Sequence, residues 1–207
     1  MTLPILWYFA DPMCSWCWGF APAIDSLRAE TRERLKIALV LGGLRPGETT
    51  PMTAAARAEI LHHWHDVHAH TGQPFRFGDA LPDGFVYNTE PSSRAVLAAA
   101  TIDPIHTFPM FKAIQSAFYA EGRDVTQGDC LAQLAESLGL DAARFASIWA
   151  SDAARDRTRA HFRQARAAGV RGFPTLIVQQ GERLDTLATG CEALDTVRAR
   201  LAACLDA

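Results

Sequence analysis

A Cys-x-x-Cys motif formed by Cys14 and Cys17 constrains this chain more than any other feature, because it separates an apolar run from a helical pattern. The apolar run, about residues 3–10, is typical of a buried strand, and the helical pattern covers about residues 16–32. Cysteines one helical turn apart bring their Cβ atoms to about 5–6 Å, within a small adjustment of disulfide geometry. The N-terminal end of a helix stabilises a thiolate. We therefore predict that Cys14 attacks and that Cys17, one turn deeper, resolves.

Two other interpretations of the pair stay open at this point: a zinc half-site, or inert core thiols in a non-catalytic module. The sequence holds no second Cys-x-x-Cys and no Cys-x-x-His that could complete a zinc site, so we expect no metal here. The chain has five cysteines, an odd number, and the other three are scattered, which argues against a structural disulfide framework. A redox pair explains the motif best.

Composition narrows the classes of protein to which the chain could belong. It has 207 residues, of which 49% are hydrophobic, enough for a sizeable core, and a net charge of −3 without any block of Lys and Arg. Nucleic acid and anionic membranes are therefore poor partners for it. No apolar run approaches the about 18–20 residues of a membrane span. The first residues carry no basic region and no cleavage site, so we expect an unexported, cytoplasmic protein.

The order of the predicted elements favours an α/β fold that is interrupted by helices. Strands at 3–9 and 35–41 flank the first helix, which predicts a right-handed βαβ unit with a parallel strand pair. A hairpin of strands at 175–178 and 184–188 follows much later and leads into a final helix. The long middle section has almost no strand pattern. We therefore predict a discontinuous α/β domain, residues 1–49 and 170–207, with a helical insertion domain at residues 50–169.

A second candidate part of the site is the segment Gly172-Phe173-Pro174-Thr175, directly before the third predicted strand. Because proline cannot donate a ladder hydrogen bond, Pro174 must lie at a strand end, and it could be no more than a residue that starts a strand. Alternatively, a cis proline in a tight turn could face the cysteines. It would then present the backbone of Phe173 for pairing with an extended substrate.

With these motifs in place, the chain resembles the DsbA branch of the thioredoxin-like proteins, especially its unexported bacterial members. The resemblance is most specific at residues 11–20 and 169–175 and covers nearly the whole chain. It implies a thioredoxin-like fold with a large helical insertion between its βαβ and ββα halves. It also implies thiol–disulfide oxidoreductase activity, in which the first cysteine attacks, the second resolves, and the proline matching Pro174 is cis.

The insertion also resembles those of kappa-class glutathione transferases and 2-hydroxychromene-2-carboxylate isomerases. These relatives typically carry serine where Cys14 stands, so the presence of both cysteines favours dithiol chemistry. A glutathione-dependent transferase or isomerase remains the alternative. We expect no cofactor beyond the redox-active pair, and disulfide- or thiol-containing proteins or glutathione as partners.

Several further residues are candidates for the rim of the site or for a separate role. Trp16 and Trp18 flank Cys17, and we predict that they bind substrate together with Phe173 and Pro174. Five histidines between His62 and His70 share one predicted helix, where a solvated polar face is the simpler interpretation and a transition-metal site the alternative. Cys191 and Arg45 have similarly open roles. Cys191 is either a thiolate at a helix start or a packed small residue, and Arg45 either binds a carboxylate or is simply solvated.

Overall fold

The computed structural model describes residues 3–78 and 80–205 of the chain. Its centre is a four-stranded sheet in the order β2-β1-β3-β4, in which β1 runs parallel to β2 and antiparallel to β3, and β3 pairs antiparallel with β4. The predicted βαβ unit and the predicted hairpin are therefore both confirmed. The strands are β1 (Ile5–Ala10), β2 (Lys36–Leu41), β3 (Thr175–Gln180) and β4 (Arg183–Thr189).

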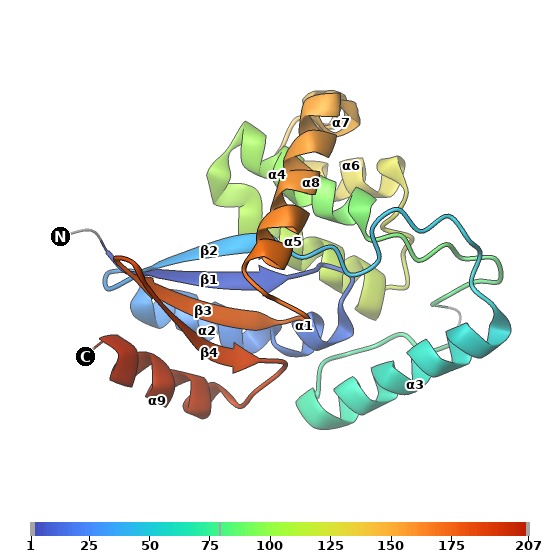
Figure 1. The fold of residues 1–207 in the computed structure, drawn as a ribbon. Helices are drawn as coiled ribbons and strands as arrows, with labels where there is room; N and C mark the ends of the chain where they lie inside the picture. The colour runs from blue at the N-terminus through green and yellow to red at the C-terminus, as the bar shows by residue number, and fades with distance from the viewer. Residues whose placement is uncertain (1–2, 79, 206–207) are drawn as a thin grey trace.

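The helices divide between the two ends of the sequence and the long middle section. Figure 1 shows α1 at one end of the sheet with α3 beyond it, whereas both chain termini lie at the opposite end. The helical elements in chain order are α1 (Ser15–Gly19), α2 (Ala21–Thr31), α3 (Ala54–Thr71), α4 (Glu90–Ile102), the 3₁₀ turn η1 (Pro104–His106), α5 (Thr107–Gln115), the π-helical turn η2 (Ser116–Ala120), α6 (Gly128–Ser137), α7 (Ala142–Ala150), α8 (Asp152–Ala167) and α9 (Leu194–Leu205).

Alternation of side chains along the central strand β1 builds two hydrophobic layers. Leu6 and Tyr8 point into the larger core, which also contains residues of α2 and α9. Phe9 points to the opposite face and packs with Val40 and with Ala165 of α8. Because successive side chains of a strand face opposite sides, an apolar run without polar alternation requires cover on both faces. The sheet therefore lies between the α2–α9 layer and α8.

One helix differs from what the sequence predicts, for a local reason. The helix expected over residues 16–32 is two helices, since Phe20 ends α1 and Pro22 occupies the first turn of α2, where proline is tolerated. In the middle section, the N-cap of α3 is Thr53, whose hydroxyl accepts from the Ala56 amide, and the N-cap of α6 is Gln127.

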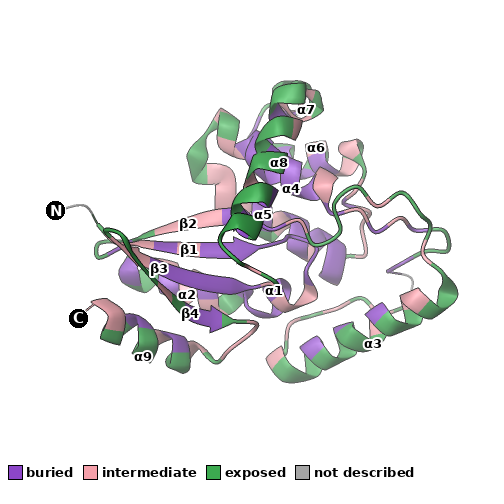
Figure 2. Ribbon diagram, viewed as in Figure 1, coloured by how far each residue is buried: buried purple, intermediate pink, exposed green. Residues whose placement is uncertain are grey.

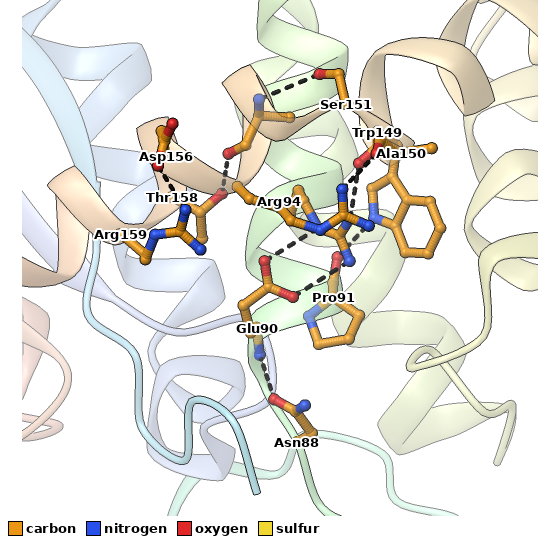
Figure 3. A network of polar contacts seen from close by, with 12 residues as sticks. Asn88, Glu90, Pro91, Arg94, Trp149, Ala150, Ser151, Asp156, Thr158 and Arg159 are labelled. Atoms are coloured by element: carbon orange, nitrogen blue, oxygen red, sulfur yellow. Dashed lines mark hydrogen bonds and ion pairs between the residues drawn. The ribbon is translucent and has the colours of Figure 1, made fainter.

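A buried arginine joins two of the inserted helices. The Arg94 side chain, 7% exposed on α4, meets both carboxylate oxygens of Glu90 at 3.0 and 3.2 Å. Its guanidinium also donates to the Trp149 carbonyl at 2.8 Å and lies 4.2 Å from the centre of the Trp149 ring. The Trp149 indole donates to the Pro91 carbonyl at 3.0 Å. Figure 3 shows this network, which fixes α4 against the end of α7.

The inserted helices and the sheet share one continuous hydrophobic core. The larger cluster holds side chains of β1 and β3 together with residues of α4, α5 and α6, and Figure 2 shows the buried strands covered by helices whose outer faces are exposed. The middle section therefore packs against the sheet. Within the described residues, no helix combines the length and the apolar character that crossing a membrane would require.

Candidate active site

Cys14 occupies the N-cap of α1, the position at which the chain leaves the extended conformation and enters the helix. Its backbone torsions are φ −94° and ψ 118°, and no side-chain oxygen caps the helix there. Serine, threonine or aspartate usually stands at this position and accepts from the first free N–H groups. In this protein a cysteine stands there, so a sulfur replaces the usual capping oxygen at the start of α1.

Cys17 lies one turn further along α1, in a drier environment. Cys14 is 6% exposed and Cys17 is fully buried, and both are free thiols in the structure. Burial raises the pKa of Cys17 well above its usual value, and its contact with Cys14 raises it further. Of the two, only Cys14 keeps any exposure to a substrate from outside, whereas Cys17 can react only with the sulfur of Cys14 itself.

The segment around Pro174 meets Cys14 from the other end of the chain. The Cys14 thiol donates to the Phe173 carbonyl with 3.5 Å between sulfur and oxygen, and the Phe173–Pro174 peptide bond is cis. Figure 1 shows the connection after α8 crossing the strands to reach β3 beside α1. The Pro174 carbonyl in turn accepts from the Gly190 amide at 2.7 Å. The backbone of Phe173 thus borders the attacking sulfur.

Gly42 makes room for the Phe173 side chain. A Cβ atom on Gly42 would lie 2.0 Å from the nearest carbon of the Phe173 ring, far inside van der Waals contact. The φ angle of Gly42 is not positive, so glycine is required here by space and not by backbone conformation. The end of β2 therefore holds the ring of Phe173, and with it the carbonyl beside Cys14.

Asp11 is a buried acid beneath the motif, and the sequence analysis treated it only as part of a turn. Its two carboxylate oxygens accept from the amides of Met13 at 2.9 Å and Leu44 at 2.8 Å. Burial raises its pKa to about 6, although these hydrogen bonds oppose the shift. A charged residue within an apolar turn directly after a buried strand was the available signal. Asp11 ties the turn before Cys14 to the end of β2.

The two tryptophans of the motif have different surroundings. Trp16 is partly exposed, and its ring meets the edge of His70 at 5.9 Å between centroids, so it lies on the rim as predicted. Trp18 is 5% exposed and donates to the Pro74 carbonyl at 2.9 Å. Its indole therefore packs α1 against the segment after α3, and a role for Trp18 in substrate binding stays a prediction.

The inserted section also positions the motif through two further hydrogen bonds. The Tyr87 hydroxyl donates to the Met13 carbonyl at 2.6 Å, and the Gln73 amide donates to the Trp18 carbonyl at 2.8 Å. One bond holds the turn before Cys14 and the other the end of α1. Both donors lie between α3 and α4, and no sequence pattern there predicts this role.

The remaining candidates lie outside the cysteine pair or beside it. Cys191, directly after Gly190, is half-buried, and its pKa is raised by burial and then by the nearby Cys14. Arg45 is exposed, with its guanidinium 5.3 Å from the centre of the Tyr87 ring. Among the α3 histidines, His65 stacks on Phe77 with 3.9 Å between ring centroids, and His68 lies 5.8 Å from the same ring in an edge-on arrangement. In the described part of the chain, no three His, Cys, Asp or Glu side chains form a potential metal site.

Comparison with known proteins agrees with this geometry. Residues 5–202 match the family model of the DSBA-like thioredoxin domain. A solved structure from Nitrosomonas europaea, of a protein proposed to be a disulfide isomerase, is 45% identical, with a TM-score of 0.93 over 99% of this chain and 98% of the other. The cytosolic disulfide reductase DsbM from Pseudomonas aeruginosa is 32% identical, with a TM-score of 0.80 over 98% of both chains, and it has also been solved with glutathione.

Two more distant matches complete the comparison. The ClpXP adapter protein SpxH from Halalkalibacterium halodurans is 24% identical over 178 residues, which are 83% of this chain. The match covers only 57% of that relative, so the chain spans little more than half the length of SpxH. A 2-hydroxychromene-2-carboxylate isomerase shares the fold at 16% identity, with a TM-score of 0.68 over 97% of this chain and 95% of the other.

Proposed function

Because this chain belongs to the family of DSBA-like thioredoxin domains, we propose that it is a thiol–disulfide oxidoreductase in which Cys14 attacks and Cys17 resolves. The observation that carries the proposal is the pairing of an N-cap cysteine that is 6% exposed with a fully buried cysteine one turn behind it. An attacking thiol must be accessible and stabilised as a thiolate, whereas a resolving thiol needs only to reach its partner.

The chemistry needs two exchange steps. The Cys14 thiolate attacks one sulfur of a substrate disulfide, so that a Cys14–substrate bond forms and the other substrate sulfur leaves as a thiolate. Cys17 then loses its proton and attacks the Cys14 sulfur, which releases the second substrate thiol and leaves a Cys14–Cys17 disulfide. Two electrons pass to the substrate. The two sulfurs are the only redox carriers this scheme requires, so no added cofactor takes part.

The Phe173 carbonyl has a part in substrate binding. It accepts from the Cys14 thiol at 3.5 Å in the resting protein. Once Cys14 is a thiolate it has no proton to donate, and the carbonyl is free to accept an N–H from an extended substrate. Backbone pairing of this kind holds a substrate beside the sulfur independently of the substrate's amino-acid sequence. Phe173 and Pro174, with Trp16 on the rim, are the substrate-binding residues of this proposal.

We propose that the enzyme works in the cytoplasm in the reducing direction, with glutathione returning it to the dithiol. Support comes from the 32% identity to a protein described as a cytosolic disulfide reductase that has been solved with glutathione. In this direction a glutathione thiolate attacks the Cys14–Cys17 disulfide, and a second glutathione releases the first as glutathione disulfide. A reducing compartment supplies that reductant in excess.

Reduction of insulin disulfides tests the proposed activity. The purified protein with excess glutathione should accelerate precipitation of the insulin B chain over glutathione alone, and Cys14→Ser should abolish the acceleration. Conjugation of glutathione to an electrophile, measured in parallel, tests a transferase. Insulin reduction that is no faster than with glutathione alone, together with conjugation that survives Cys14→Ser, would reject the dithiol enzyme.

A further inference from the structure

A cavity of about 440 Å³ opens directly beside the candidate active site. One face of the β3–β4 hairpin forms its floor, where Thr175 and Ile177 of β3 lie opposite Thr189 and Thr186 of β4. The connection that follows α8 forms its wall. The lining residues are those at 168–173, Thr175, Ile177, Thr186, Thr189 and Gly190.

The cavity and the attacking sulfur share a border. Phe173 lines the cavity, and its carbonyl lies 3.5 Å from the Cys14 sulfur. Gly190 also lines it and is hydrogen-bonded to Pro174. An extended chain advances about 3.3 Å per residue. The residues next to a cysteine that is bound to Cys14 therefore lie within reach of this cavity.

The charge of the residues that line the cavity indicates which chemical group the cavity would bind. Arg171 is the only charged side chain that lines the cavity, and among the described residues none forms an ion pair with it. The Glu192 carboxylate, which accepts from the amide of the lining residue Thr189 at 3.3 Å, already pairs with Arg200 at 2.7 Å. The Thr175 hydroxyl donates to the Gly172 carbonyl at 2.8 Å, so the further donors are the hydroxyls of Thr186 and Thr189. A guanidinium that no protein carboxylate occupies, beside hydroxyl donors, suits a carboxylate from outside.

We propose that this cavity is a substrate subsite that takes an acidic side chain flanking the reacting cysteine of a peptide, with Arg171 binding its carboxylate. The inference rests on the proposed thiol–disulfide exchange at Cys14 and adds a sequence preference to it. Backbone pairing at Phe173 holds any extended peptide, and the cavity discriminates among them.

Short peptides whose cysteine carries 2-nitro-5-thiobenzoate as a mixed disulfide test the subsite, since release of the coloured thiol measures attack by Cys14. Two series place Glu, Ala or Lys directly before or directly after the cysteine. The ratio of kcat/KM for Glu over Lys should exceed one in only one series, by about two- to fivefold, the range for an exposed ion pair. Arg171→Glu should invert that ratio. Thr186→Trp, which fills the cavity, should reduce it toward one.

Arg163→Glu is the matched control, because Arg163 is exposed on α8, carries the same charge and does not line the cavity. Equal effects of Arg171→Glu and Arg163→Glu, or equal Glu preference in both series, would overturn the subsite and indicate only a long-range field. The reporter disulfide of glutathione forms a separate arm, and a loss confined to it would contradict a peptide side chain as the occupant. Failure of the proposed function would give a different result from failure of the subsite. If Cys14 does not attack, the Cys14→Ser variant would release the coloured thiol from every peptide as fast as the unmodified protein does.

Discussion

At the scale of single residues, the site depends on the absence of a Cβ atom at Gly42. The Phe173 ring fills the space of a Cβ on Gly42, and the same residue places its carbonyl at the Cys14 sulfur. The absence of a side chain at position 42 therefore affects the position of the Phe173 carbonyl beside Cys14. Neither the Gly42-Gly43 pair nor Phe173 shows this contact in the sequence, because 131 positions separate them and only the fold brings them together.

We predict that Gly42→Ala lowers kcat/KM for disulfide reduction. The added methyl group overlaps the Phe173 ring and must displace it, at a cost of about 1–3 kcal/mol for an overpacked site. A double-mutant cycle checks the cause: Gly42→Ala should cost much less activity when Phe173 is already Ala. Gly78→Ala, where an added Cβ meets nothing within 4 Å, is the matched control. Additive losses in the cycle would show that the ring is not the group that the methyl displaces.

The buried carboxyl of Asp11 makes the stability of the folded protein depend on pH. Its pKa rises from 3.8 to about 6 in the folded protein because the carboxyl is buried. Between about pH 4 and pH 6 the folded state therefore binds a proton that the unfolded state has released. The stability that this proton binding contributes is complete below pH 4 and is lost as the pH rises through 6. Two pKa units correspond to about 3 kcal/mol.

We predict that Asp11→Asn, which cannot ionise, lacks this decline. The free energy of unfolding of the variant, relative to the unmodified protein, should rise by up to about 3 kcal/mol between pH 4 and pH 7. Guanidinium denaturation at a series of pH values measures it. Parallel pH curves for the two proteins would mean that Asp11 ionises normally in the fold.

At the scale of elements, the sequence predicted the type and order of the helices and strands better than their ends. Apolar periodicity and the positions of Gly and Pro locate each element, since they reflect burial and backbone freedom. The ends depend on tertiary contacts. At Gly128, in the first turn of α6, an added Cβ would meet the Trp149 ring at 2.9 Å, a contact that no local pattern reveals. The sequence likewise does not reveal the hydrogen bond from Trp18 to Pro74, because the two residues lie 56 positions apart.

The Arg94 network makes a prediction at this scale. Arg94→Lys keeps the charge but loses the planar fork that meets both Glu90 oxygens and the Trp149 carbonyl. We expect a loss of about 1–3 kcal/mol in the free energy of unfolding, because the partly buried Glu90 carboxylate, 22% exposed, is left poorly paired. Arg159→Lys is the control, since Arg159 pairs with Asp156 on the exposed surface and should change little. Equal stability of the two variants in urea denaturation would contradict this role of Arg94.

At the scale of the whole molecule, the site assembles from the two ends of the sequence and is clamped by its middle. Cys14 and Phe173 meet across 159 positions, whereas Tyr87 and Gln73 hold the turn and helix around the motif. The sequence predicted the meeting of the ends, because the Cys-x-x-Cys and the Phe-Pro segment each carry a local pattern. It did not predict the clamp, which depends on how the inserted loop folds over α1. The division into two domains stays a prediction, and the continuous core predicts that both parts unfold together.

The central claim is that Cys14 forms the bond to the substrate and Cys17 breaks it. Cys17→Ser removes the resolving thiol and leaves the N-cap sulfur in place, so the first intermediate cannot proceed. After incubation with glutathione disulfide, intact mass and peptide mapping should locate one glutathione per chain on Cys14 of this variant. The unmodified protein should instead carry an internal Cys14–Cys17 disulfide, and Cys14→Ser should carry nothing on Cys17, which is fully buried. A Cys17→Ser protein without any adduct, or a Cys14→Ser protein modified at Cys17 to the same extent, would contradict the account.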